Sequence, residues 1–319
     1  MFIEKKRAGK SIKYYLAHSY REKGVPRKIR KYLGANLLEK ELEQKQKLVA
    51  KIIYDLISEL NTEIFNFSLT PSQINSLNKL NENIKIVKLS KENLRIFTQE
   101  FVYNTNAIEG SRLLMQEVEE MLNSSKKASN FDELEARGVA KAMKYIRETD
   151  GELSLELIKK LHFLCFEKTK SFAGNFRNVE VVVKNSLGEI VHQGVLVKEL
   201  NSYLNDLISW YKKNKLKIKP LILAGVVHNQ FEYIHPFQDG NGRVGRLLLN
   251  FILFKNKYPP INIHLEDRQE YYSTLQEYQI YKNLKPTIEF LVKQYNKTLK
   301  EVTTINKKSK KSSPPRNKK

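Results

Sequence analysis

The amino-acid sequence predicts a mainly α-helical fold that is preceded by a short β meander. From residue 35 onward apolar residues recur at helical spacing, most densely in Leu221–Tyr233 and Val244–Phe254. Residues 1–34 instead contain three short segments rich in Ile, Tyr and Leu, separated by turn residues. One later stretch, residues 181–193, has the pattern of a small β-hairpin, so we expect little sheet in the body of the chain.

The first 34 residues predict a basic meander. The segments FIEKK, SIKYYLAHSY and RKIRKYL are separated by turns around Gly9 and Gly24, and eleven Lys or Arg residues face only two acids. The segment is similar to N-terminal hairpins of some transposase-like proteins. Its charge favours contact with nucleic acid or another polyanion. A surface that only keeps the chain in solution is the alternative.

A helical linker region is expected over residues 35–89. From Ala35 to Leu60 an apolar stripe runs between Glu, Lys and Gln residues, and residues 61–89 are more mixed. Ser90 is placed to cap the next helix, about residues 91–110, and Gly110 stands where a left-handed helix end belongs. Further capping residues and apolar repeats predict helices over Leu114–Leu122, Phe131–Ile146, Leu155–Glu167, Arg268–Tyr281 and Pro286–Leu299. Pro259 and Pro260 should end the helix before them. His162 lies on an apolar helix face and is interpreted as a packed core residue.

The segment richest in candidate catalytic and anion-binding residues is His235–Arg246, which reads HPFQDGNGRVGR. It lies between two apolar helical segments, so we expect a tight loop that runs into the N-terminus of the second helix. The glycines let backbone N–H groups approach an anion, and the helix N-terminus favours negative charge. The loop therefore predicts a binding site for the phosphates of a nucleotide.

The side chains of this loop suggest separate roles. Asp239 suits Mg²⁺, which prefers few carboxylates together with phosphate oxygens and water. Arg243 and Arg246 are three residues apart, so we expect both on one helix face as clamps for phosphate. His235 is suited to take a proton from an attacking hydroxyl near neutral pH.

This segment resembles the Fic (filamentation induced by cAMP) family, whose motif is H-x-F-x-[D/E]-G-N-G-R-x-x-R. Every fixed position is filled, and the resemblance extends over residues 90–300. It implies an all-helical core and transfer of AMP from ATP to a Tyr, Ser or Thr hydroxyl of a target protein. By position it implies His235 as base, Asp239 as the Mg²⁺ ligand and Phe237 as an apolar pin of the loop. The implied ATP-binding residues are Gly240, Asn241, Gly242, Arg243 and Arg246.

A second motif precedes the core. Thr105–Gly110 matches [S/T]-x-x-x-E-[G/N], an inhibitory motif of many Fic proteins. Thr105 and Glu109 are one helical turn apart and so share a face. The resemblance implies that Glu109 pairs with Arg246 and keeps ATP from seating its α-phosphorus for attack.

Two further elements follow from the resemblance. The hairpin at residues 181–193 corresponds to the flap along which a target protein lies as an added strand. Its downstream segment GVLVKEL lacks the usual Pro-rich sequence, so individual flap contacts are not carried over. In the Tyr-rich helix, Tyr272 and Gln279 take the positions that contact adenine, whereas Tyr271 is equally well explained as core filler.

Composition limits the remaining classes of protein. The 319 residues contain one cysteine, Cys165, which excludes an internal disulfide framework. We see no apolar run of membrane-spanning length and no signal peptide, and expect a cytoplasmic protein. The net charge of +21 comes largely from residues 1–34 and from a basic tail, residues 301–319, that we expect to be disordered.

Several functions therefore remain open. The same site could remove AMP from a modified protein, or transfer UMP or another phosphate-containing group. In a different class, the chain could be a nucleic-acid-binding regulator whose basic ends carry the function and whose Fic body senses a nucleotide.

Overall fold

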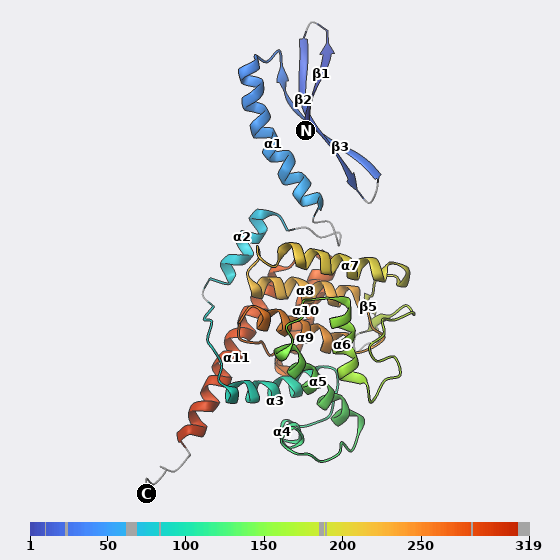
Figure 1. Cartoon of the computed structure of the whole chain (residues 1–319), viewed down its shortest axis with the longest axis vertical. Coiled ribbons are helices and arrows are strands. Elements are labelled where there is room, and N and C mark those ends of the chain that lie inside the picture. The colour runs from blue at the N-terminus through green and yellow to red at the C-terminus, as the bar shows by residue number, and fades with distance from the viewer. Residues whose placement is uncertain are drawn as a thin grey trace. The chain divides into compact units, whose positions relative to one another are not determined.

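The computed structural model describes residues 1–9, 11–22, 25–61, 69–82, 84–184, 188, 190–281 and 283–311. The chain forms two compact units, Met1–Ile74 and Asn75–Lys319. Figure 1 shows the N-terminal unit as a sheet with one long helix and the second unit as a helical body.

The N-terminal unit contains the predicted antiparallel sheet. Its strands are β1 (Phe2–Ala8), β2 (Ser11–Glu22) and β3 (Val25–Ala35), in the order β1-β2-β3. Ile3 lies opposite Leu16, and Tyr15 lies opposite Tyr32. The prediction of a three-stranded meander is confirmed. Lys10, Lys23 and Gly24, which belong to the expected turns, lie outside the described residues.

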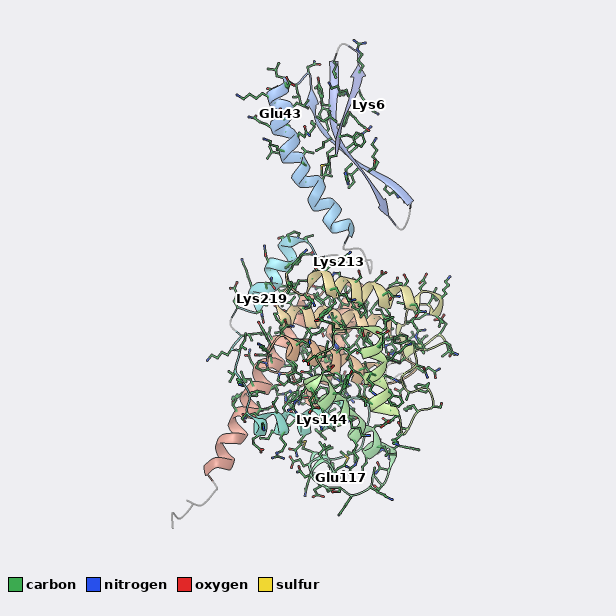
Figure 2. The ribbon with its side chains drawn as sticks, in the orientation of Figure 1. Lys6, Glu43, Glu117, Lys144, Lys213 and Lys219 are labelled. Carbon is green, nitrogen blue, oxygen red and sulfur yellow. The ribbon has the colours of Figure 1, made fainter. Side chains whose placement is uncertain are left out.

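Helix α1 (Glu39–Asn61) covers one face of this sheet. Leu16 and Leu33 from the sheet and Ile53 from the helix form its buried core, each at most 5% exposed. Because side chains alternate across a strand, the residues between these apolar ones lie on the open face. Figure 2 shows the side chain of Lys6 on the sheet and that of Glu43 on α1.

The second unit is a helical bundle with one small hairpin. After α2 (Pro71–Leu80), at the boundary of the units, its helices are α3 (Lys91–Ile108), α4 (Met115–Asn123), α5 (Phe131–Glu148), α6 (Leu155–Phe166), α7 (Val197–Asn214), α8 (Pro220–Ile234), α9 (Asn241–Lys255), η1 (Leu265–Asp267), α10 (Arg268–Tyr281) and α11 (Lys285–Lys311).

Helices α8 and α9 form the centre of the bundle. Nearly every residue of α8 is buried, in contact with α7, α9, α10 and α11. Helix α9 packs on α3, α5 and α6. The continuous apolar character of these two helices arises because they are enclosed on several sides. The connection between them is thus held by two rigid elements.

Local capping explains several helix starts. The Oγ of Ser90 accepts the N–H of Asn93 at 3.0 Å, and the Asn93 side chain accepts the N–H of Ser90 in return. Asn130 and Ser154 cap α5 and α6 in the same way. Gly110, with φ of 97°, follows the end of α3 as predicted.

Two helix ends differ from expectation. Helix α9 stops at Lys255, before Pro259, because Lys257 takes a left-handed conformation with φ of 60°. Helix α11 continues to Lys311, so the part of the expected disordered tail from 301 to 311 is helical. Thr303 donates its hydroxyl to the carbonyl of Leu299, one turn earlier. The rest of the tail lies outside the described residues.

The predicted hairpin contains β4 (Val182–Lys184) and β5 (Ile190–Gln193), which pair antiparallel. Ser186 and Leu187 of the expected turn are not among the described residues. Among the described helices, none combines the length and apolar character that are needed to cross a bilayer.

Candidate active site

The loop between α8 and α9 starts with a strained histidine. His235 ends α8 in the left-handed region, with φ of 53°. This conformation is uncommon outside glycine and needs support from its surroundings. The support comes from Arg177, whose Nε donates to the carbonyl of His235 at 2.7 Å.

Arg177 is a buried positioning residue that the sequence did not reveal. Its guanidinium also donates to the carbonyl of Val179 at 3.0 Å and to that of Val195. Burial lowers the pKa of Arg177. Five donors in a rigid fork satisfy several carbonyls at once, which a lysine could not do. Arg177 thus ties the start of the hairpin to the base.

The rest of the loop is held by side chains of its own. Asn241 accepts the N–H of Phe237 and donates to its carbonyl, both at 2.9 Å. The Phe237 ring is fully buried and stacks on His162 with ring centroids 3.8 Å apart. His162 Nδ1 accepts the N–H of Gly174, so Nε2 donates to the carbonyl of Asp239. The interpretation of His162 as a core histidine is confirmed.

A cavity of about 410 Å³ opens beside this loop. It is lined by Glu109, which directly follows α3, and by residues of α8, α9, α10 and the hairpin. Of the predicted site residues, those that line it are Glu109, His235, Gly242, Arg246, Tyr272 and Gln279. Residues from, or directly next to, five separate elements therefore meet at this cavity.

His235 has the electrostatic character of a neutral base. Its Nδ1 lies 3.3 Å from the carbonyl of Glu232, which can only accept, so Nδ1 carries the proton and Nε2 keeps a lone pair. Burial, assisted by nearby His192, lowers the pKa of His235 to about 4. The imidazole is therefore neutral at physiological pH.

Arg246 reaches into the cavity and is held from α3. Its Nη2 donates to Oε1 of Glu109 at 2.6 Å and to the carbonyl of Thr105 at 3.0 Å, while Nε donates to Thr105 Oγ1 at 2.7 Å. The helix face predicted for Thr105 and Glu109 is thus the face that meets Arg246. Burial opposes the charge, but the Glu109 carboxylate outweighs it and raises the pKa of Arg246.

One nitrogen of the Arg246 guanidinium donates to none of the described residues. Its Nη1 is buried and has no hydrogen-bond partner among the residues that the structure describes. A buried unpaired guanidinium donor is costly, so an anion that supplies oxygen atoms would be bound favourably here.

Glu232 is a further acid at the cavity that sequence reasoning missed. It is 6% exposed, and burial raises the pKa of its carboxyl to about 8. Nearby, His228 Nε2 and the hydroxyl of Tyr271 lie 2.8 Å apart. Tyr271 is almost fully buried, as expected of core filler, and it also lines the cavity, so both interpretations of this residue stay open.

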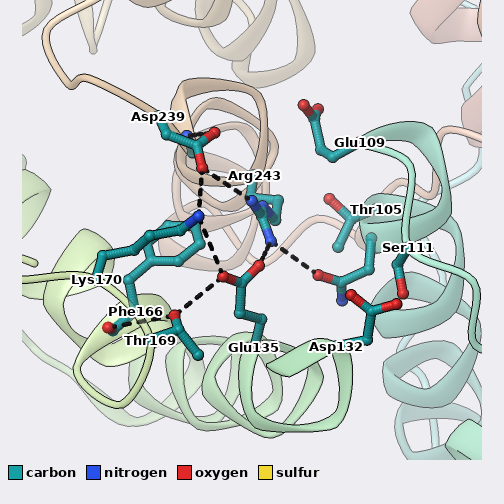
Figure 3. Close-up of polar contacts among 12 residues, drawn as sticks. Thr105, Glu109, Ser111, Asp132, Glu135, Phe166, Thr169, Lys170, Asp239 and Arg243 are labelled. Atoms are coloured by element: carbon teal, nitrogen blue, oxygen red, sulfur yellow. Dashed lines mark hydrogen bonds and ion pairs between the residues drawn. The ribbon is translucent and has the colours of Figure 1, made fainter. Parts of the chain in front are cut away.

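Arg243 does not share the cavity with Arg246. Its Nη1 is paired with Glu135 on α5, and its guanidinium lies over the ring of Phe166, 4.4 Å from the centroid. Figure 3 shows this pairing and the neighbouring contact of Lys170 with Asp239. Arg243 is thus not among the residues that line this cavity, and its role as a second phosphate clamp stays a prediction.

Asp239 lies beside Arg243, 46% exposed. Burial would raise the pKa of Asp239, but a hydrogen bond from Lys170 and the charge of Arg243 outweigh it and lower that pKa. The described residues contain no group of three or more His, Cys, Asp or Glu that could hold a metal. One ionised carboxylate fits Mg²⁺, which takes its other ligands from phosphates and water.

The far end of the cavity is lined by α10. The hydroxyl of Tyr272 donates to the carbonyl of Ile108 at 3.3 Å, and Gln279 lies on the same helix two turns further on. Arg268 and Gln276 also line this end and were not foreseen. Both lie on the helix already expected to contact adenine.

Comparisons with known proteins find distant relatives of this chain. Residues 152–253 match the model of the Fic/DOC family. A curated relative, Protein adenylyltransferase Fic of Nematostella vectensis, is 28% identical over 206 residues, which are 62% of this chain and 47% of that protein. The fic-1 adenylyltransferase of Caenorhabditis elegans is 28% identical over 203 residues, 60% of this chain and 39% of that protein. The chain thus spans less than half of these relatives.

Solved structures show the same fold. A Fic domain containing signaling protein from Bacteroides thetaiotaomicron superimposes with a TM-score of 0.61 at 24% identity, covering 72% of this chain and 94% of that one. Fic-1 from C. elegans superimposes with a TM-score of 0.58 at 22% identity, covering 86% and 80%. Residues 152–253 thus match the Fic/DOC family model, and the chain has the mainly helical Fic fold.

Proposed function

We propose that the protein is an adenylyltransferase that transfers AMP from ATP to a hydroxyl of a target protein. The observation that carries the proposal is the meeting of a neutral base, His235, with the buried unpaired donor of Arg246 in one cavity. A base at the end of α8 and an anion receptor in α9 are what attack on a nucleotide phosphate requires. The distant relatives named protein adenylyltransferase support this reaction.

The residues of the loop and of the start of α9 would each serve one step of the reaction. Nε2 of His235 takes the proton of a Tyr, Ser or Thr hydroxyl, and the oxygen forms a bond to the α-phosphorus of ATP. The bond from that phosphorus to the bridging oxygen breaks, and pyrophosphate leaves with the bonding electrons. Arg246 and the backbone of Gly240 and Gly242 stabilise the phosphates at the start of α9. Mg²⁺ at Asp239 would neutralise phosphate charge.

Adenine would lie against α10, with Tyr272 and Gln279 at the cavity wall. Tyr272 has an aromatic face and Gln279 an amide, the groups that commonly hold a base. The target would lie along the hairpin at residues 181–193, whose Val183, Val191 and His192 line the cavity next to His235. A protein of the same fold, IbpA Fic2, is known covalently tethered to Cdc42 (TM-score 0.50, 16% identity).

Glu109 would restrain this reaction. It occupies Nη2 of Arg246, a donor that the γ-phosphate of ATP needs. While the carboxylate stays there, ATP cannot place its α-phosphorus in line with the hydroxyl. Removing Glu109 should therefore release the activity.

Intact-mass measurement tests the proposal. Wild type, Glu109→Gly and Glu109→Gly/His235→Ala are incubated with ATP and Mg²⁺. We expect a gain of one AMP on the chain itself only in Glu109→Gly. Gain in the double variant would refute His235 as the base. No gain in any form would favour a different donor, removal of AMP, or an obligatory foreign target.

A second function concerns the N-terminal unit, and we propose that its open sheet face binds nucleic acid. Arg30 lies over the ring of Tyr15 at 4.7 Å, and Tyr15 packs against Tyr32 with centroids 5.2 Å apart. By strand alternation Lys6 and Lys13 lie on the same face. Cations beside aromatic rings on an open sheet face fit both phosphates and bases.

Fluorescence anisotropy with a labelled 20-mer duplex and with its single strand tests this second proposal. We expect binding that weakens with salt, and that the Lys13→Glu/Arg30→Glu variant loses at least tenfold in affinity. The matched control, Lys144→Glu/Lys213→Glu, makes the same change of charge on the second unit, at the residues labelled in Figure 2. Equal loss in both variants would reduce the effect to net charge and contradict the proposal.

A further inference from the structure

The ammonium group of Lys170 contacts the carboxylate of Asp239, which is proposed to hold Mg²⁺. Lys170 belongs to the turn after α6, outside the loop motif, and its backbone N–H is held by the carbonyl of Phe166 at 3.0 Å. Its Nζ lies 2.8 Å from Oδ2 of Asp239 and 3.6 Å from Oε1 of Glu135 (Figure 3). One ammonium thus stands between two carboxylates of different elements.

The two oxygens of Asp239 have different surroundings. Oδ1 accepts the N–H of Gly240 at 2.6 Å and is committed to the loop. Oδ2 is the oxygen on which the ammonium of Lys170 lies, whereas Nη2 of Arg243 is farther away at 3.9 Å. A divalent ion at this carboxylate would have to use Oδ2.

Two cations would compete for that oxygen, because their positive charges repel each other. Mg²⁺ binds a carboxylate oxygen at about 2.1 Å, which would place it in the position of the ammonium or against it. Glu135 gives the ammonium another place to go. Its Oε1 also accepts the hydroxyl of Thr169 at 3.0 Å, which holds it beside Lys170.

We propose that Lys170 is a built-in cation of the metal site, which neutralises Asp239 in the absence of a divalent ion and moves to Glu135 when the ion binds. The proposal rests on the proposed nucleotide site. Without a cation at Oδ2, the Asp239 carboxylate would repel the phosphates of a nucleotide. Lys170 therefore allows a nucleotide to bind before the metal, and competes with the metal afterwards.

Calorimetric titration with ADP tests the proposal without any turnover. ADP lacks the γ-phosphate and so does not compete with Glu109 for Arg246. Wild type, Lys170→Met and Lys170→Arg are titrated in EDTA and in saturating Mg²⁺. The matched control is Lys141→Met, which removes a lysine paired with Glu167 at 2.9 Å outside the site.

We expect opposite responses in the two buffers. In EDTA, Lys170→Met should bind ADP about tenfold more weakly than wild type, because one charge near the phosphates is lost. In Mg²⁺ it should bind ADP as tightly as wild type or more tightly. Lys170→Arg should keep the metal-free affinity, and Lys141→Met should change neither value.

Equal weakening of Lys170→Met in both buffers would mean that Lys170 only supports the turn, and would overturn the proposal. Unchanged affinity in EDTA would overturn it as well. Wild type that binds no ADP in either buffer would remove the nucleotide site and this inference together, whereas binding that ignores Lys170 would remove the inference alone.

Discussion

The carboxylate of Glu109 and the guanidinium of Arg246 meet inside the cavity, with Oε1 2.6 Å from Nη2, although 137 residues separate them in the chain. The Arg246 side chain is 3% exposed and that of Glu109 26% exposed. The pair is therefore screened little by solvent on the arginine side, and its strength depends on the charge of Glu109.

Glu109→Gln should isolate that charge. The amide oxygen still accepts from Arg246, but the ionic part is lost, so we expect ATP to bind about three to tenfold more tightly than to wild type. ADP should change less, because it has no γ-phosphate. Titration calorimetry with both nucleotides measures the difference. Glu148→Gln, at the exposed end of α5, is the control, and an ATP affinity equal to wild type would contradict the restraint.

His235 should become protonated only at a lower pH than an ordinary histidine. Because burial lowers the pKa of His235 to about 4, the neutral, base-active form persists down to that pH, and is lost only below it. An ordinary histidine would lose half of its neutral form at about pH 6.5. NMR titration of the imidazole protons, assigned with His235→Ala, should show no His235 transition between pH 8 and 5. A transition near 6.5 would contradict the buried neutral base.

Arg177→Lys should impair His235 as the base but leave nucleotide binding in the cavity nearly unchanged. A single ammonium cannot satisfy the carbonyls of Val179, Val195 and His235 together, so we expect a loss of about 2–3 kcal/mol in the free energy of unfolding. In the Glu109→Gly background, AMP transfer should fall at least tenfold while the ADP affinity changes less than threefold. Arg147→Lys on the surface of α5 is the control. Loss of ADP binding equal to the loss of transfer would argue against a positioning role.

Glu232→Gln should change how stability depends on pH. Burial raises the pKa of Glu232 to about 8, so its contribution to stability is fully present below the unfolded pKa near 4.5 and is lost as pH rises through 8. The neutral glutamine avoids this loss. We expect the variant to gain about 4 kcal/mol over wild type between pH 5 and pH 8.5. Chemical unfolding at both values measures it, and a constant difference would mean that the carboxyl is already ionised at pH 5.

The features predictable from the sequence are those set by near neighbours. Ser90, Asn130 and Ser154 cap helices through contacts three residues away, and the sheet follows from alternation within each strand. The loop from His235 to Arg246 was predictable because its glycines, base and acid are adjacent. The pairing of Glu109 with Arg246 came from the resemblance to a family.

What was missed depends on distant elements. Glu135 is one of several acids on an amphipathic helix, and nothing local distinguishes it from a solvent-exposed residue. It nevertheless pairs with Arg243, because α5 packs on α9. Lys170 has no local signal either, since its partner Asp239 is set by the packing of α6 near the loop. The extension of α11 to Lys311 could not be predicted, because a Lys-rich segment is as typical of a disordered tail as of an exposed helix.

The Asn241 side chain, which bonds both the N–H and the carbonyl of Phe237, closes the loop on itself before any nucleotide arrives. Little conformational freedom then remains to be lost on binding, and less of the contact energy is spent on ordering the backbone. The rate of nucleotide association should therefore not be limited by ordering of the loop. Differences in affinity among nucleotides should therefore arise mainly in how long each stays bound, and residence time would be the quantity by which the site selects its donor.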